Sequence, residues 1–146
     1  METLRVLVVD DEVAFVEMLV NWLRKRKLEA EGAISGDEAL ALMKEEQFDV
    51  VVLDIKMPGR LDGIGTLREI RRIAPLTEVI LLTAYASLET AIEAMKLGVF
   101  DYLLKPVKLE QLMLRLGAIF EKKGAQEEKI REIIRSPSES PQNEKD

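Results

Sequence analysis

The segment that decides the fold reads Val50-Val51-Val52-Leu53-Asp54-Ile55-Lys56-Met57-Pro58-Gly59. Its first four residues are apolar and three of them are β-branched, which is typical of a strand buried on both faces of a parallel sheet. The strand ends at the carboxylate of Asp54, and Pro58-Gly59 favours a turn just beyond it. A single aspartate at a strand end usually caps a turn or a helix, so Asp54 alone does not indicate a function.

Other apolar runs in the chain also end in charged side chains. Asp10-Asp11 follows the run Leu7-Val8-Val9, and Lys105-Pro106 follows the run Tyr102-Leu103-Leu104. Because the carboxyl ends of parallel strands meet at one edge of a sheet, these charged residues and the aspartate of the first segment are expected to form one site.

Strand and helix signals alternate along the first 123 residues. We expect strands over 4–9, 29–33, 49–53, 78–82 and 100–104, and helices over 13–27, 36–46, 62–73, 88–97 and 109–123. This alternation predicts an α/β fold, a doubly wound five-stranded parallel sheet with five helices on its two faces. The favoured strand order is 2-1-3-4-5, in which strands one and three are neighbours at the switch point where ligands bind.

Composition limits the chemistry that the chain can perform. Its 146 residues, 47% hydrophobic and 33% charged, fit one globular domain with a short extension. The absence of cysteine and histidine excludes disulfides, thiol nucleophiles, the usual zinc ligands and Ser-His-Asp triads. The net charge of -6, without a basic cluster, argues against direct binding of nucleic acid. No apolar run approaches the ~20 residues of a membrane span, and no signal peptide is evident, so we expect a cytoplasmic protein without membrane contact.

The character of the sequence changes near Gly124. We expect one domain over 1–123, followed over 124–146 by a short helical extension and a disordered Ser/Pro-rich tail. The extension would be a helix over 126–135 that carries Ile130, Ile133 and Ile134 on one side.

The charged strand ends suggest phosphoryl-transfer chemistry. Three carboxylates (Asp10, Asp11 and Asp54) in one pocket repel one another, and Lys105 alone does not offset that repulsion. Magnesium prefers oxygen ligands and is commonly completed by phosphate oxygens, so it is the expected cofactor. With the metal bound, Asp54 can act as a nucleophile while Lys105 and the hydroxyl of Thr83 contact phosphoryl oxygens.

At this point the sequence resembles the response-regulator receiver domains of two-component signalling, over about residues 3–122. Within this range, the run Gly98-Val99-Phe100-Asp101-Tyr102-Leu103 is most similar to receivers of ATPase-type transcription activators. The resemblance rests on four motifs at consecutive strand ends, which are Asp10-Asp11, Asp54 ahead of Met57-Pro58-Gly59, Thr83-Ala84 and Lys105-Pro106.

The resemblance implies a flavodoxin-like fold and a phosphoacceptor rather than an enzyme with its own substrate. Asp54 would accept a phosphoryl group from the phosphohistidine of a sensor histidine kinase, since this chain has no histidine. Asp11, Asp54 and the backbone carbonyl of Lys56 would bind Mg²⁺, with Asp10 acting through a metal-bound water. Thr83 and Lys105 would contact the phosphoryl group, and the Lys105–Pro106 bond would be cis.

The resemblance also implies a switch with a downstream output domain or partner. Thr83 would move toward phosphorylated Asp54, and Tyr102 would follow it, remodelling the face of the fourth helix, fifth strand and fifth helix. Homodimerisation through this face is a further expectation, because Asp101 and Arg115 match a pair that links subunits in some receivers. One departure from the common pattern is a loop over 57–63 that is one residue longer than usual.

Simpler interpretations exist for each of these residues. Asp10 and Asp11 could cap the first helix, Thr83 could be an ordinary strand-end hydroxyl, and Tyr102 could belong to the core. Three other classes of protein compete with a phosphoacceptor. A phosphohydrolase would need an aspartate at position 56, where this chain has a lysine. An FMN carrier would need a phosphate-binding loop after the first strand, where this chain has Asp10-Asp11-Glu12. A receiver-like interaction domain that is never phosphorylated remains the alternative function.

Overall fold

The computed structural model describes residues 3–57, 62–84 and 87–135. A five-stranded parallel sheet with the order β2-β1-β3-β4-β5 forms its centre, as predicted. The strands are β1 (Arg5–Val9), β2 (Glu29–Ala33), β3 (Val50–Leu53), β4 (Glu78–Thr83) and β5 (Asp101–Leu104). In this order β1 and β3 are neighbours, so the switch point lies between them.

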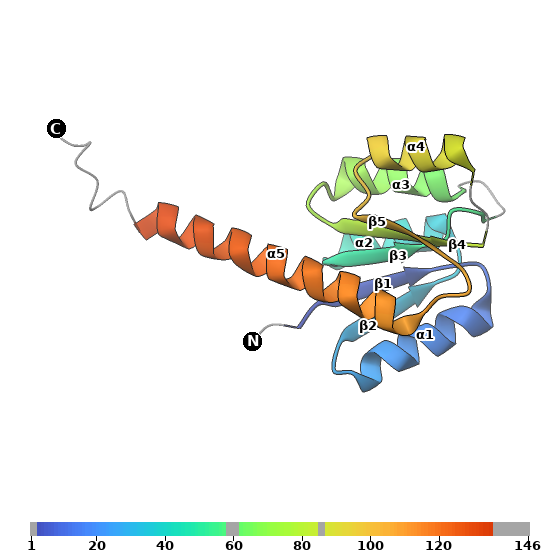
Figure 1. Ribbon diagram of the computed structural model, residues 1–146, viewed down its shortest axis with the longest axis horizontal. Coiled ribbons are helices and arrows are strands. Elements are labelled where there is room, and N and C mark those ends of the chain that lie inside the picture. The colour runs from blue at the N-terminus through green and yellow to red at the C-terminus, as the bar shows by residue number, and fades with distance from the viewer. Residues whose placement is uncertain (1–2, 58–61, 85–86, 136–146) are drawn as a thin grey trace.

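Five helices cover the sheet on both faces (Figure 1). They are α1 (Val13–Lys25), α2 (Gly36–Glu45), α3 (Gly63–Ile73), α4 (Leu88–Lys96) and α5 (Leu109–Arg135). Helices α1 and α5 pack on one face, and α2, α3 and α4 pack on the other. No helix in the described part of the chain is both long enough and apolar enough to span a membrane.

The apolar runs of the strands supply both halves of the core. Val51 and Leu53 of β3 belong to the cluster beneath α2, α3 and α4, whereas Val50 and Val52 belong to the cluster beneath α1 and α5. Successive residues of a strand point to opposite faces, so a strand covered on both sides must be apolar throughout. This explains why the decisive segment shows no alternation of polar and apolar residues.

Helix α2 begins with a capping arrangement formed by Ser35 and Glu38. The hydroxyl of Ser35 accepts a hydrogen bond from the Glu38 backbone N–H at 3.1 Å. The carboxylate of Glu38 accepts one from the Ile34 N–H at 2.7 Å, one residue before the cap. Two N–H groups at the start of the helix are thereby satisfied by side chains.

Replacing Ser35 by alanine is expected to lower the free energy of unfolding by about 1 kcal/mol, because the N–H of Glu38 loses its acceptor. Urea denaturation followed by circular dichroism measures this change. Ser35→Asp, which keeps an acceptor at the same position, should stay close to wild type. An equal loss in both variants would show that the cap is not the cause.

The predicted end of the last helix, at residue 123, is wrong. The helix expected over 109–123 and the separate extension expected over 126–135 form one continuous helix, α5. Gly124 lies within this helix with open space around it, and good helix formers flank it, so its low propensity does not stop the helix. The other element ends agree with the prediction or differ from it by one or two residues.

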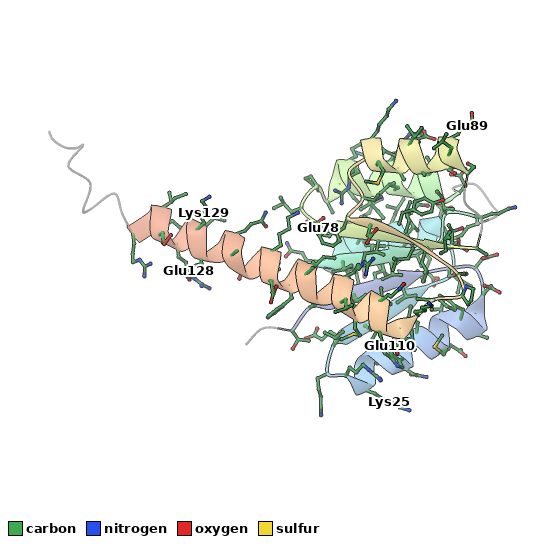
Figure 2. The ribbon with its side chains drawn as sticks, in the orientation of Figure 1. Lys25, Glu78, Glu89, Glu110, Glu128 and Lys129 are labelled. Atoms are coloured by element: carbon green, nitrogen blue, oxygen red, sulfur yellow. The ribbon has the colours of Figure 1, made fainter. Side chains whose placement is uncertain are left out.

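The second half of α5 extends beyond the sheet (Figures 1 and 2). Glu128 and Lys129 lie on this projecting part in Figure 2, and Glu128 forms ion pairs with Arg131 and Arg135. Three isoleucines on the same segment, at positions 130, 133 and 134, are exposed. The division of the chain into a domain over 1–123 and an extension stays a prediction.

Asp101 and Arg115 form an ion pair within one chain, with Arg115 Nε at 2.6 Å from Asp101 Oδ2. In some receivers that the sequence resembles, the matching pair links two subunits. Since both charges are satisfied internally here, a pair between subunits would have to replace this contact. Homodimerisation through α4, β5 and α5 stays a prediction.

Candidate functional site

Backbone pairing brings the predicted site residues together at the carboxyl edge of the sheet. The N–H of Asp54 donates to the carbonyl of Val9 at 2.9 Å, which places Asp54 beside the residue that follows Val9. On the other side of the sheet centre, the N–H of Lys105 donates to the carbonyl of Thr83 at 2.8 Å. The order of the strands therefore joins residues that are far apart in the sequence.

Three carboxylates cluster at the switch point, as the sequence predicts. One carboxylate oxygen from each of Asp10, Asp11 and Asp54 lies within 4.8 Å of the other two. Asp10 is only 1% exposed and Asp54 7% exposed, whereas Asp11 is exposed to solvent. Such a cluster costs free energy unless cations or hydrogen-bond donors offset the burial and the repulsion.

The environment of Asp54 raises the pKa of its carboxyl group. Burial is the main cause, and the charges of Asp10 and Asp11 act in the same direction. The N–H of Lys56 donates to Asp54 Oδ1 at 3.2 Å and, together with the charge of Lys105, opposes the rise. The ionised form of Asp54 is thus incompletely compensated by the protein itself.

Lys105 is the cation of this cluster. Its Nζ donates to Asp10 Oδ2 at 2.6 Å and to Glu12 Oε1 at 3.2 Å, and it lies 3.7 Å from Asp54 Oδ2. Burial lowers the pKa of the ammonium group, but the hydrogen bonds to Asp10 and Glu12, together with the charges of Asp10 and Asp54, raise it more, so the net direction is upward. Lys105 Nζ also lies over the ring of Phe15, 4.4 Å from the ring centroid. The Lys105–Pro106 peptide bond is cis, as expected.

The donor set fits a hard divalent cation. All three candidate ligand groups are carboxylates, two of them are buried, and burial raises the pKa of one of these, Asp54. Mg²⁺ takes oxygen ligands and keeps several waters, so a partly open cluster of carboxylates suits it.

The remaining predicted site residues lie around this cluster. Thr83 ends β4 and is fully buried, and Tyr102 of β5 is partly buried against the core on the α2–α4 face. The side chain of Lys56 is exposed, while its backbone faces Asp54. In the longer loop over 57–63, residues 58–61 lie outside the described residues.

The capping interpretation of Asp10 is correct only in part. Asp10 Oδ1 accepts a hydrogen bond from the N–H of Glu12 at 2.9 Å, while Asp10 Oδ2 faces Lys105. Glu12 is the N-cap residue of α1 and makes no side-chain capping bond. Asp10 therefore orders the start of the helix and belongs to the charged cluster at the same time.

Sequence reasoning missed three residues of the site. Glu12 and Phe15 surround the ammonium of Lys105, and Gly63 approaches the backbone of Ile55 directly after the phosphoacceptor candidate. Glu12 extends the acidic pair by one residue, so its position next to that pair was an available signal. The contacts of Phe15 and Gly63 depend on packing and had no comparable signal in the sequence.

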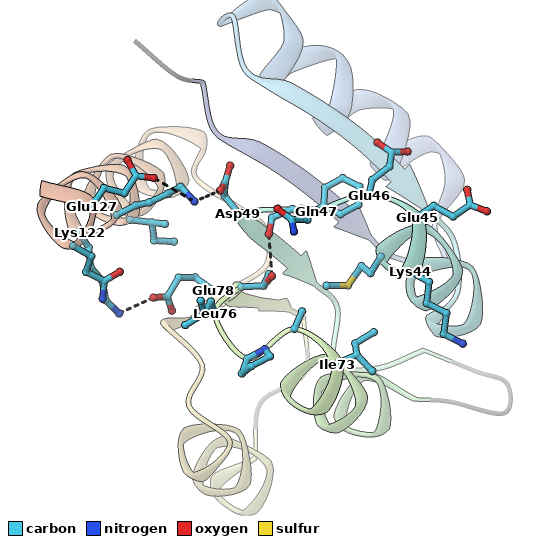
Figure 3. A pocket seen from close by; sticks show the side chains of 18 residues that line it. Lys44, Glu45, Glu46, Gln47, Asp49, Ile73, Leu76, Glu78, Lys122 and Glu127 are labelled. Atoms are coloured by element: carbon cyan, nitrogen blue, oxygen red, sulfur yellow. Dashed lines mark hydrogen bonds and ion pairs between the residues drawn. The ribbon is translucent and has the colours of Figure 1, made fainter. Parts of the chain in front are cut away.

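A hollow of about 710 Å³ lies at the other end of the sheet (Figure 3). Asp49, just before β3, and Glu78, at the start of β4, line it together with side chains of α5. Lys123 pairs with Asp49 at 2.7 Å and Lys122 with Glu78 at 2.6 Å, so charged side chains brace α5 against the strands there. Since the carboxylate cluster lies at the carboxyl ends of the strands, this hollow is not part of it.

The fold and the site define a class of signalling protein. The family model described as "Response regulator receiver domain" matches residues 6–117, and the chain belongs to this family. Membership confirms the resemblance seen in the sequence and agrees with the flavodoxin-like order of the strands.

The chain is also similar to individual regulatory proteins. The chain is 42% identical over 107 residues to the transcriptional regulatory protein ZraR of Salmonella typhimurium, covering 73% of this chain and 24% of that protein. It is 44% identical over 110 residues to the regulatory protein AtoC of Escherichia coli, covering 75% of this chain and 24% of that protein. The chain thus spans about a quarter of the length of these curated relatives.

The chain is also similar to solved structures of response regulators. NtrX from Brucella abortus matches with a TM-score of 0.79 and 32% identity, covering 87% of this chain and 29% of that chain. A response regulator receiver domain protein from Clostridium thermocellum matches with a TM-score of 0.78 and 37% identity, covering 84% of this chain and 98% of that chain. The likeness to the second structure extends over nearly its whole length.

Proposed function

We propose that this chain is a phosphoacceptor that receives a phosphoryl group on Asp54 from the phosphohistidine of a sensor histidine kinase. One observation carries the proposal. Asp54 is 7% exposed at the end of a central strand, two other carboxylates lie beside it, and Lys105 Nζ lies 3.7 Å from its Oδ2. Membership of the receiver family supports the same reaction.

The transfer step requires only one nucleophile from this chain. An oxygen of the Asp54 carboxylate donates its electron pair to phosphorus, and the P–O bond of an aspartyl phosphate forms. The P–N bond of the phosphohistidine breaks, its electron pair stays on the imidazole nitrogen, and that nitrogen takes a proton from water. The chain supplies position and charge rather than a second covalent step.

The residues around Asp54 have separate tasks in this proposal. Asp10, Asp11, Asp54 and the carbonyl of Lys56 would hold Mg²⁺, which neutralises carboxylate and phosphoryl charge when bound. Lys105 binds a phosphoryl oxygen, and to reach it the ammonium gives up its contact with Glu12 and part of its contact with Asp10. The N–H of Lys56, already directed at Asp54, orients the nucleophile.

The output of the site is a change of packing at β4 and β5. A phosphoryl dianion on Asp54 attracts the hydroxyl of Thr83, and movement of Thr83 leaves space that Tyr102 can enter. Tyr102 is partly buried and pairs in register with Leu81 on the strand that ends at Thr83. The face of α4, β5 and α5 then presents a different surface to an output domain or partner, by analogy with the transcription regulators among its relatives.

Intact mass after incubation with acetyl phosphate tests the proposal. One added phosphoryl group is expected in the presence of Mg²⁺ and none when EDTA replaces it. Peptide mapping should place the adduct on Asp54. If no adduct forms and beryllofluoride, a phosphoryl mimic, does not bind in the presence of Mg²⁺, the chain is a receiver-like interaction domain that works without phosphorylation.

A further inference from the structure

The ammonium group of Lys105 is held away from the acceptor carboxylate. It donates to Asp10 at 2.6 Å and to Glu12 at 3.2 Å, but its distance to Asp54 Oδ2 is 3.7 Å, longer than a hydrogen bond. The ring of Phe15 covers another side of the ammonium. Three groups thus hold Lys105 on the α1 side of the site.

Of the three residues that contact the ammonium of Lys105, Glu12 is the one whose side chain has no other evident structural role. Its side chain is 67% exposed and it occupies the N-cap of α1, where serine, threonine, aspartate or asparagine would usually accept from the first turn. Its carboxylate makes no such bond and instead contacts Lys105. The N-cap position of α1 therefore has no capping side chain, and Glu12 forms an ion pair with Lys105 instead.

We infer that Glu12 is a positioning residue that acts through Lys105 and opposes the transfer of its ammonium to the phosphoryl group on Asp54. This inference rests on the function proposed above. When a phosphoryl group is present, Lys105 must turn from Glu12 toward it, so the contact with Glu12 is lost on modification. The loss of this contact favours the unmodified state of the site.

The size of the effect follows from the exposure of Glu12. An ion pair with one mostly exposed partner contributes little, because water screens the charges. We therefore expect that Glu12→Gln tightens the binding of beryllofluoride by about threefold in the presence of Mg²⁺. The affinity for Mg²⁺ alone should not increase, since the variant removes a negative charge near the metal ligands.

Isothermal titration calorimetry of beryllofluoride in excess Mg²⁺ tests the inference with four proteins: wild type, Glu12→Gln, Lys105→Met and the double variant. The increase in beryllofluoride affinity caused by Glu12→Gln should disappear in the Lys105→Met background, because Glu12 acts only through the ammonium of Lys105. Glu17→Gln removes a comparable exposed carboxylate from the same helix and should bind like wild type.

The outcomes separate this inference from the proposed function. If wild type fails to bind beryllofluoride, the proposed function is wrong and the inference falls with it. If wild type binds and Glu12→Gln binds equally well, only the inference is overturned. An undiminished gain in the Lys105→Met background would also overturn it, because Glu12 would then act on the anion directly.

Discussion

Replacing Asp54 by asparagine is expected to abolish the phosphoryl adduct and, at the same time, to make the unmodified protein more stable. Asparagine cannot form an acyl phosphate, so no mass increase from acetyl phosphate should remain at this position. The stability should rise because the buried carboxylate is only partly compensated, and an amide of the same shape removes the repulsion from Asp10 and Asp11. We expect a gain in the free energy of unfolding, measured by urea at neutral pH in EDTA.

The pH dependence of this gain follows from the direction of the pKa shift. Because the pKa of Asp54 is raised in the fold, its stabilising contribution is present below the pKa of the unfolded chain. That contribution is lost as the pH rises through the folded pKa. Asparagine does not ionise, so the advantage of Asp54→Asn should be largest at neutral pH and disappear in acid.

Two controls test the cause of the gain. Glu17→Gln removes one exposed carboxylate from α1 and should leave stability almost unchanged. Mg²⁺ should stabilise wild type against urea and stabilise Asp54→Asn much less, since one ligand is gone. An Asp54→Asn protein that is less stable than wild type in EDTA would contradict this description of the site.

Replacing Gly63 by alanine is expected to have the largest effect on stability, a loss of about 3 kcal/mol or more. A Cβ at this position would lie 2.2 Å from the Cα of Ile55 and 2.4 Å from its carbonyl oxygen. Both atoms are backbone, so no side-chain rotation can relieve the clash. The N–H of Gly63 also donates to that carbonyl at 3.1 Å, which fixes the start of α3 beside the segment that carries Asp54.

Gly117→Ala is the matched control for this substitution. Gly117 lies within α5, is exposed, and would have no atom within 4 Å of an added Cβ. There alanine should raise the free energy of unfolding by up to about 1 kcal/mol, through its higher helix propensity. Urea denaturation of both variants measures the contrast. Equal effects of the two substitutions would mean that the close approach of Gly63 does not limit stability.

Much of the fold was predictable because local signals and long-range pairing agree. The run 50–53 is apolar at every position, and only a strand covered on both faces requires this pattern. Ser35 and Ser87, residue types that favour the N-cap position, precede α2 and α4 and cap them. The end of α5 was not predictable, because a single glycine is a weak signal against the helix propensity of the residues around it.

The sequence by itself determined the chemistry of the candidate site. Acidic residues at 10, 11 and 54, a hydroxyl at 83 and a lysine at 105 lie at or just after the carboxyl end of a strand, and the rule for parallel sheets places them at one edge. No knowledge of distances is needed for that step, since strand direction and order alone fix the edge.

Only the tertiary structure decided how these groups share their charges. Lys105 Nζ lies 2.6 Å from Asp10, 3.2 Å from Glu12 and 3.7 Å from Asp54, so its preference depends on small differences between side-chain distances. The close approach of Gly63 to Ile55 likewise depends on how α3 docks beneath β3. Such contacts join residues through packing in three dimensions, and the spacing of residues along a sequence does not encode packing at that resolution.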